Sequence, residues 1–275
     1  MRSTDRVLTT VLRGRTPSNH TTRPRTTHVP VQVVILAAGM GTRLGRSIPK
    51  PLTPLRNGQS ILGRQLDCLR SVLGSDSSVT AVVGYRGKKI MKAEPDLLFA
   101  YNPDYKTTNT SKSLLRALRT SREGGVLWLN GDVVFDPAVL HLALPCLRAD
   151  QSFVCVDTNT VAEEEVKYTL DDEGYVRELS KTVVGGLGEA VGINYVSSGD
   201  KAALIDHLEA CGDQDYFERG IETAIQQQGL RFRPIDISQF AAVEVDFETD
   251  LQRANTLLPG GLNVVEAVPE IAEVG

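Results

Sequence analysis

The chain has 275 residues, of which 41% are hydrophobic, with a formal net charge of −4 and a sequence pI near 5.7. A chain of this size can bury one substantial core, and its acidic balance argues against a nucleic-acid-binding protein. No apolar run approaches the ~20 residues of a membrane-spanning helix, so we expect a soluble protein. The four cysteines lack the spacing of a disulfide frame or a zinc site, so we expect reduced thiols and a cytoplasmic location.

The two ends of the chain differ in composition from its middle. Residues 1–30 contain six arginines and a single acid, Asp5, among many threonines. Few apolar residues are available to order such a segment, so we predict a disordered tail, with a transit peptide or an anion-binding arm as the alternatives. Residues 259–275, which begin Pro259-Gly260-Gly261, are predicted to form a flexible C-terminal tail. One folded domain is therefore expected over residues 31–258.

Within that domain, short apolar runs alternate with amphipathic segments. Strands are predicted at 31–36, 80–84, 97–101, 126–129, 153–156, 189–196, 231–235 and 243–245. Helices are predicted at 60–73, 110–121, 137–147, 201–210, 216–228 and 249–257. This alternation is typical of βαβ units and predicts an α/β fold with a largely parallel sheet, in which ligands bind at the carboxyl ends of the strands.

The first predicted strand runs directly into a glycine-containing segment, Leu36-Ala37-Ala38-Gly39-Met40-Gly41-Thr42-Arg43-Leu44, and Pro49-Lys50-Pro51 follows after a short loop. Glycine permits positive φ and a close approach of the backbone to phosphate oxygens, and Arg43 and Lys50 add two cations. An ordinary strand-to-helix turn is the alternative. We interpret the segment as a nucleotide phosphate site, with Arg43 and Lys50 as the catalytic residues and with a binding loop formed by Ala38, Gly39, Met40, Gly41 and Thr42.

Two common phosphate-binding motifs do not fit this segment. A Walker A loop requires Gly-Lys-Ser/Thr, but Gly87-Lys88 is followed by Lys89. The Rossmann fingerprint requires a third glycine where Leu44 stands, and Gly45 misses that position by one residue. Neither motif therefore describes this segment.

Two aspartates each come shortly after a predicted strand. Asp132 follows Asn130-Gly131, and Asp246 follows Val243-Glu244-Val245. If both strands lie in the same sheet, the two carboxylates meet at the edge that carries the glycine loop, and their oxygens are the ligands that Mg²⁺ prefers. For either aspartate alone, a helix N-cap or a solvated turn is the alternative. We predict that Asp132 and Asp246 together bind Mg²⁺.

These groups favour direct displacement over covalent catalysis. No Ser-His-Asp signature is present, and the histidines lie in the N-terminal segment or on predicted helices. An ionised phosphate or phosphonate oxygen needs no general base to attack the α-phosphorus of a nucleotide. Positioning and charge compensation by Arg43, Lys50 and Mg²⁺ would then be sufficient for in-line displacement of pyrophosphate.

The Gly-x-Gly-Thr-Arg loop with its downstream Pro-Lys resembles the sugar-nucleotidyltransferase-like superfamily, over about residues 31–258. Within that superfamily the chain is most similar to the phosphocholine and phosphonate cytidylyltransferases, which join CTP to a small organic phosphate or phosphonate. The resemblance implies a Rossmann-like three-layer αβα nucleotidyltransferase fold and CTP as the donor, and it supports magnesium at Asp132 and Asp246. A sugar-1-phosphate nucleotidylyltransferase and an inactive regulatory module are the alternatives. A homodimer is compatible with the sequence.

Recognition of the acceptor is predicted from a second segment and from scattered charges. Residues 101–114 resemble the cytidylyltransferase pattern Asn-x-x-x-Ser-Leu, which implies that Asn109 and Ser113 lie near the nucleotide and the acceptor. Lys112 stands where choline-handling relatives often have an aromatic residue, and trimethylammonium groups are best held by aromatic cages, so an anionic acceptor is favoured over phosphocholine. A solvated surface position is the alternative for each of the predicted acceptor cations, Lys112, Lys167 and Lys181, with Arg86 and Lys89 as weaker options.

Two further acids, Glu189 and Glu218, are candidates for holding an acceptor amine or hydroxyl, with a structural role as the alternative. The expected acceptor is a phosphonate such as phosphonoformate, 2-hydroxyethylphosphonate or 2-aminoethylphosphonate.

Overall fold

The computed structural model describes residues 31–75, 77–159 and 164–258, so the tails predicted at 1–30 and 259–275 lie outside the described residues. The strands are β1 (Gln32–Ala37), β2 (Ser78–Val83), β3 (Leu98–Tyr101), β4 (Val126–Asn130), β5 (Val133–Phe135), β6 (Phe153–Asp157), β7 (Lys167–Leu170), β8 (Val176–Ser180), β9 (Glu189–Val196), β10 (Arg233–Asp236) and β11 (Ala242–Glu244). The helices are α1 (Ile61–Leu73), α2 (Gly87–Ala93), α3 (Thr110–Thr120), α4 (Ala138–Arg148), α5 (Lys201–Ala210), α6 (Phe217–Gln228) and α7 (Glu248–Thr256), with single 3₁₀ turns at Thr42–Leu44 and Lys50–Leu52.

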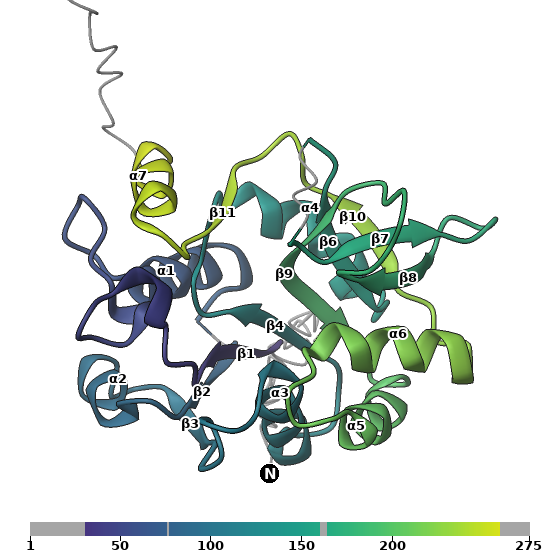
Figure 1. Ribbon diagram of the computed structural model, residues 1–275, viewed down its shortest axis with the longest axis horizontal. Coiled ribbons are helices and arrows are strands. Elements are labelled where there is room, and N and C mark those ends of the chain that lie inside the picture. The colour runs from purple at the N-terminus through teal and green to yellow at the C-terminus, as the bar shows by residue number, and fades with distance from the viewer. Residues whose placement is uncertain (1–30, 76, 160–163, 259–275) are drawn as a thin grey trace, which may run out of the picture.

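The central sheet has the strand order β10-β6-β9-β4-β1-β2-β3 (Figure 1). Strands β4, β1, β2 and β3 pair in parallel, as do β10 and β6, whereas β9 is antiparallel to both of its neighbours, β4 and β6. Strand β1 is buried along its whole length and consists largely of Val, Ile and Leu, as expected for a strand covered on both faces. The predicted α/β fold with a mostly parallel sheet is therefore confirmed.

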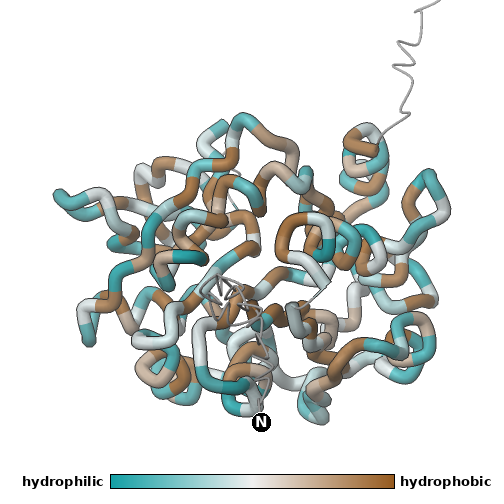
Figure 2. The backbone as a smooth tube through the Cα atoms, turned by 180° about the vertical axis from the view of Figure 1, so that it is seen from behind, coloured by the Kyte–Doolittle hydropathy of each residue, from teal (hydrophilic) through white to brown (hydrophobic). Residues whose placement is uncertain are grey.

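Helices cover both faces of this sheet. One apolar cluster joins the sheet to α1 and α4, through residues such as Leu66 and Leu140, and a second joins the opposite face to α3, α5 and α6, through residues such as Leu114 and Ile221. In Figure 2 the outer turns are mostly hydrophilic, while apolar segments run through the interior. This arrangement is the three-layer αβα architecture that the resemblance implied.

Local signals in the sequence account for the helices that border the site. Helix α1 begins where Ser60 Oγ accepts a hydrogen bond from Gly63 N at 2.9 Å, and α3 begins where Asn109 Oδ1 accepts from Thr110 N at 2.8 Å. Helix α6 ends at Gly229, whose φ of 69° suits a left-handed C-terminal residue. These elements match the predicted ones to within two residues at the helix starts.

Four elements were not predicted. Helix α2 has only seven residues, and it begins after Arg86, which adopts a left-handed φ of 49°. Strands β5, β7 and β8 have three to five residues, and β7 and β8 form a hairpin attached to β9. Such short segments carry too few periodic residues to be recognised, because their structure depends on partners distant in the sequence.

A separate two-stranded sheet, β5 with β11, corrects the expectation that Asp132 and Asp246 extend from one sheet. The pairing is antiparallel, matches Glu244 with Val133, and continues with a hydrogen bond from Val245 N to Asp132 O at 3.0 Å. Helix α7 packs over this small sheet through Leu251. The small sheet thus brings residue 246 back to residue 132.

Among residues 31–75, 77–159 and 164–258, no helix combines the length and apolar character needed to cross a bilayer.

Candidate active site

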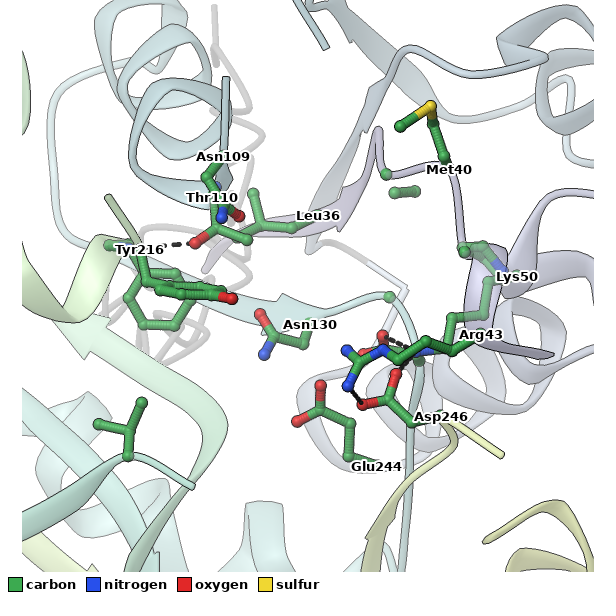
Figure 3. Close-up of a pocket in the computed structure, with 18 of the residues that line it drawn as sticks. Leu36, Met40, Arg43, Lys50, Asn109, Thr110, Asn130, Tyr216, Glu244 and Asp246 are labelled. Atoms are coloured by element: carbon green, nitrogen blue, oxygen red, sulfur yellow. Dashed lines mark hydrogen bonds and ion pairs between the residues drawn. The ribbon is translucent and has the colours of Figure 1, made fainter. Parts of the chain in front are cut away.

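A cavity of about 330 Å³ opens at the carboxyl ends of β1 and β4. The loop after β1, the turn after β4, the first residues of α3 and α6, and the end of β11 all contribute to its wall. Figure 3 shows Arg43, Lys50 and Asp246 converging on one side of this cavity, with Asn109 and Tyr216 across from them. Its position agrees with the expected ligand site of a parallel sheet.

The glycine loop has the backbone geometry that its sequence predicted. Gly41 adopts a φ of 57°, and a Cβ atom there would lie 2.9 Å from Cβ of Lys50. Gly39, Met40, Gly41 and Thr42 line the cavity, whereas Ala38 does not. Instead, the carbonyl oxygen of Ala38 accepts a hydrogen bond from Tyr85 N at 3.0 Å, which anchors the loop to the segment after β2. Ala38 therefore supports the loop without contributing to its wall.

Lys50 lies between the two aspartates singled out from the sequence. Its Nζ is 2.7 Å from Oδ2 of Asp132 and also contacts Oδ1 of Asp246, while Arg43 Nη1 lies 2.8 Å from Oδ2 of Asp246. Burial by itself lowers the pKa of the Lys50 ammonium, but the charges and hydrogen bonds of Asp132 and Asp246 outweigh it, so the pKa is raised overall. Lys50 is therefore a fixed positive charge inside an acidic cluster.

A third carboxylate, Glu244, belongs to this cluster and was not predicted. Oxygens of Asp132, Glu244 and Asp246 lie within 4.8 Å of one another. The negative charge of Asp132 raises the pKa of Glu244 well above its ordinary range, and burial and Asp246 add to the effect. Glu244 and Asp246 are two residues apart on an extended segment, so their side chains point to the same side. The two-residue spacing of Glu244 and Asp246 was the signal in the sequence. It was overlooked because Glu244 stands between two valines.

These carboxylates fit a divalent cation by their chemistry. All three donors are hard oxygens, and Asp132 Oδ1 is buried with no hydrogen-bond partner among the described residues. Lys50 contacts Asp132 and Asp246, and Arg43 contacts Asp246, so their charges offset the mutual repulsion of the acids. Asp132, Glu244 and Asp246 are therefore the residues that could hold a divalent cation here.

The wall of the cavity contains further charged residues. Glu165, Lys181 and Glu218 line it beside Tyr216, and Lys181 Nζ lies 4.7 Å from the centroid of the Tyr216 ring. Glu218 is only 8% exposed, and burial raises the pKa of its carboxyl to about 7. Burial also raises the pKa of Glu165, against the charge of Lys181. Lys181 and Glu218 were predicted as acceptor residues, whereas Glu165 and Tyr216 were not.

The position of Lys112 corrects the prediction that it contacts the acceptor. Its ammonium donates to the carbonyl oxygens of Leu208, Glu209 and Cys211, at 3.2, 2.9 and 2.5 Å, near the C-terminal end of α5. A lysine there satisfies the helix-end carbonyls and complements the helix dipole. Lys112 does not line the cavity, and it joins α3 to α5 instead of meeting an acceptor.

The two polar residues predicted around Lys112 behave differently from each other. Ser113 is buried, and its Oγ accepts a hydrogen bond from Asn102 Nδ2 at 3.1 Å, outside the cavity wall. Asn109, the N-cap of α3, lines the cavity together with Thr110. Only Asn109 is therefore positioned to meet a ligand directly.

Lys167 and Glu189 lie opposite each other on β7 and β9 and do not line the main cavity. Glu189 instead lines a neighbouring cavity of about 340 Å³. Neither Arg86 nor Lys89 lines either cavity. The predicted convergence of three lysines on one acceptor is thus reduced to Lys181.

Comparisons with known proteins show the family and the fold. Residues 33–229 match the protein family described as "MobA-like NTP transferase domain". The chain is 29% identical over 264 residues to CMP-5'-(3-aminopropyl)phosphonate synthase of Streptomyces rubellomurinus (strain ATCC 31215). The aligned region covers 82% of this chain and 38% of that relative. The chain thus corresponds to well under half the length of this curated relative.

Two solved structures share the fold at low sequence identity. The inositol-1-phosphate CTP transferase from T. maritima superposes with a TM-score of 0.68 at 16% identity, covering 85% of this chain and 98% of that one. The CTP:phosphocholine cytidylyltransferase from Streptococcus pneumoniae gives a TM-score of 0.66 at 16% identity, covering 83% and 99%. The predicted nucleotidyltransferase fold is confirmed. Because the family match extends over well more than half of the residues of this chain, the chain belongs to the family of MobA-like NTP transferase domains.

Proposed function

We propose that the protein is a Mg²⁺-dependent cytidylyltransferase that transfers CMP from CTP to a small phosphonate or organic phosphate and releases pyrophosphate. The observation that carries this proposal is the contact of Lys50 with Asp132 and Asp246 beside the glycine loop. That contact joins phosphate-binding cations to carboxylates suited to a divalent cation. The names of the relative and of both structural neighbours mention CMP or CTP, which supports cytidine as the base.

The proposed reaction needs no general base, because the attacking oxygen of the acceptor is already ionised. An ionised phosphonate oxygen forms a bond to the α-phosphorus of CTP, and the bond from that phosphorus to the bridging oxygen of the β-phosphate breaks. The bonding electron pair leaves with pyrophosphate, and no proton has to be removed from the nucleophile. Arg43 and the backbone N–H groups of the glycine loop would bind the departing pyrophosphate, and Lys50 would stabilise charge at the reacting centre.

Magnesium, held by Asp132, Glu244 and Asp246, would supply Lewis-acid stabilisation of the phosphate charge. Until a nucleotide is bound, Lys50 neutralises the same carboxylates. Because Lys50 contacts Asp132 and Asp246, a cation held by these carboxylates would share them with the lysine, whose ammonium would then be available to the phosphates.

The test is a matrix of CTP, UTP, dTTP and GTP against phosphonoformate, 2-hydroxyethylphosphonate, 2-aminoethylphosphonate, phosphocholine and a hexose-1-phosphate. Pyrophosphate release is measured with Mg²⁺, with EDTA, and with Mg²⁺ restored. The expected result is release with CTP and a phosphonate, lost with EDTA and recovered with Mg²⁺. A preference for a hexose-1-phosphate with another nucleotide would indicate a sugar-1-phosphate nucleotidylyltransferase, and no release with any pair would indicate a regulatory module.

Two accompanying predictions concern the protein as a whole. A homodimer would be detected by light scattering of the purified chain, with twice the 29.9 kDa chain mass as the expected value. A cytoplasmic location would be detected by fractionation of the producing cells.

A further inference from the structure

Gln65 is a polar residue at an apolar position of α1. Its side chain is 0% exposed, and the four-residue spacing places it on the same face of the helix as Ile61 and Leu69. Its Oε1 is buried with no hydrogen-bond partner among the described residues. A leucine or methionine would fill this position without the cost of an unpaired oxygen. The role of Gln65 therefore lies in its amide nitrogen.

That nitrogen joins the two ends of the turn that carries Asp132. Nε2 of Gln65 donates to the carbonyl oxygen of Asn130, the last residue of β4, at 2.8 Å, and to that of Val133, the first residue of β5, at 2.8 Å. Both N–H donors of the amide are thus used. Only Gly131 and Asp132 lie between the two carbonyl groups. One buried side chain therefore holds the turn at both of its ends.

The position of this turn sets the distances within the acidic cluster. The carbonyl oxygen of Asp132 accepts a hydrogen bond from Val245 N at 3.0 Å, and Asp246 follows Val245 directly. Oδ2 of Asp132 lies 2.7 Å from Nζ of Lys50. A shift of the turn would therefore move the carboxylate of Asp132 away from both the lysine and the second aspartate.

Helix α1 also supports the segment that carries Lys50. Ile61 N, at the start of the helix, donates to Thr53 O at 3.1 Å, and Thr53 N donates to Lys50 O at 2.9 Å. Gln65 lies one helical turn after Ile61. The helix thus contacts the lysine segment through its first turn and the turn of Asp132 through its second.

We propose that Gln65 is a positioning residue for the cation site, because its amide fixes residues 130–133 and so orients the carboxylate of Asp132. Groups that hold a metal-binding side chain in place commonly matter for the metal, and their loss lowers metal affinity or activity by about 10- to 100-fold. Gln65 does not line the cavity, so it acts through Asp132. The inference rests on the proposed function, since it names the support of a proposed cation ligand.

The first experiment measures cation binding without nucleotide. Gln65→Met keeps the length of the side chain and removes both donors. Titration with Mn²⁺, followed by electron paramagnetic resonance, should show an affinity about tenfold lower than that of wild type. In an Asp132→Asn background, Gln65→Met should cause little further loss, because residues that act through one another are not additive. Unchanged affinity in Gln65→Met, or the same loss in both backgrounds, would overturn the proposal.

Two neighbours of Gln65 on α1 provide the controls. Cys68 Sγ donates to Phe135 O at 3.8 Å, which is a contact between the same helix and the same strand beyond the turn. Leu69 is completely buried in the apolar core. Cys68→Ala and Leu69→Ala should both leave Mn²⁺ affinity unchanged, although Leu69→Ala should lower the urea midpoint through the cavity that it creates. An equal loss of affinity in Leu69→Ala would reduce the effect of Gln65 to general stability and reject the positioning role.

The second experiment uses the Mg²⁺ dependence of pyrophosphate release. In Gln65→Met the Mg²⁺ concentration for half-maximal release should rise about tenfold, and saturating Mg²⁺ should return kcat to within a few-fold of wild type. A merely destabilised protein would not regain turnover in this way. A fall in kcat that saturating Mg²⁺ does not reverse, together with wild-type Mn²⁺ affinity, would contradict the proposal.

The outcomes separate this inference from the proposed function. If no acceptor reacts, the Mn²⁺ titrations still test Gln65. If Gln65→Met releases pyrophosphate with the Mg²⁺ requirement of wild type, the positioning role is overturned and the cytidylyltransferase remains. Should Gln65→Met fail to fold, Gln65→Asn keeps an amide that is one methylene shorter and cannot bridge both carbonyl groups in the same way. Its Mn²⁺ affinity should also be reduced, and wild-type affinity would reject the proposal.

Discussion

The ammonium nitrogen of Lys50 lies 2.7 Å from Oδ2 of Asp132, although 82 residues separate the two in sequence. A 3₁₀ turn presents Lys50, and the turn between β4 and β5 presents Asp132. Gly131 makes this approach possible, because its N–H donates to Leu36 O at 3.0 Å and a Cβ atom there would lie 2.6 Å from the same oxygen. The lysine therefore occupies space that the aspartates would otherwise offer to a cation.

Replacing Lys50 by methionine should separate catalysis from folding. Methionine keeps an unbranched chain but removes the charge, so turnover should fall by about 100-fold or more, as when a single transition-state donor is removed. Circular dichroism should still report a folded protein. Lys89→Met is the control, since Lys89 is exposed on α2 and outside both cavities. Wild-type turnover in a folded Lys50→Met protein would contradict the catalytic role.

The same substitution should strengthen cation binding in the absence of nucleotide. With Lys50 between Asp132 and Asp246, an incoming cation has to displace a paired ammonium group. Titration with Mn²⁺, followed by electron paramagnetic resonance, should give an affinity about tenfold higher for Lys50→Met than for wild type, since removal of a nearby positive charge favours the metal. Adding Asp246→Asn should abolish that gain, while Asp206→Asn, on the exposed side of α5, should not. Equal affinities would show that Lys50 does not compete with the cation.

Two glycines in the segment after β1 provide a matched test of its geometry. Gly41 and Gly45 both have positive φ, 57° and 66°, but only at Gly41 would a Cβ atom meet Lys50, at 2.9 Å. Each substitution by alanine should lower the unfolding free energy by about 1 kcal/mol through backbone strain. Only Gly41→Ala should also lower turnover, because it pushes Lys50 away from the aspartates. Urea unfolding and pyrophosphate release measure the two effects, and equal turnover in both variants would contradict the contact.

The parts of this site that depend on local sequence could be predicted. The strand that leads into Gly39 and Gly41 has an apolar run and a glycine turn within a dozen residues, and the structure has both. The proximity of Asp132 and Asp246 was also expected, but for the wrong reason. The expectation assumed one sheet, whereas β11 pairs with β5, a three-residue strand that was not predicted, in a separate antiparallel sheet that makes the connection.

The remaining errors in the predicted site concern residues whose surroundings depend on elements distant in the sequence. Lys112 lies next to residues of the site along the chain, yet its length carries its ammonium to the end of α5. Glu165 lies two residues before β7 in a segment without periodicity, and only the fold places it in the wall of the same cavity as Glu218 and Lys181. Charge alone could not distinguish these residues, because lysines and glutamates are most often solvated.

Glu218 should make the stability of the protein depend on pH. Because burial raises its pKa to about 7 in the folded state, the folded protein binds more protons than the unfolded chain between about pH 4.5 and pH 7. The contribution is fully present below that window and is lost as pH rises through it, by on the order of 3 kcal/mol. Glu218→Gln cannot titrate, so its unfolding free energy relative to wild type should rise from pH 5 to pH 8. Urea unfolding at four pH values measures this difference, with Glu222→Gln as the control, and parallel pH curves for wild type and Glu218→Gln would show that Glu218 ionises normally.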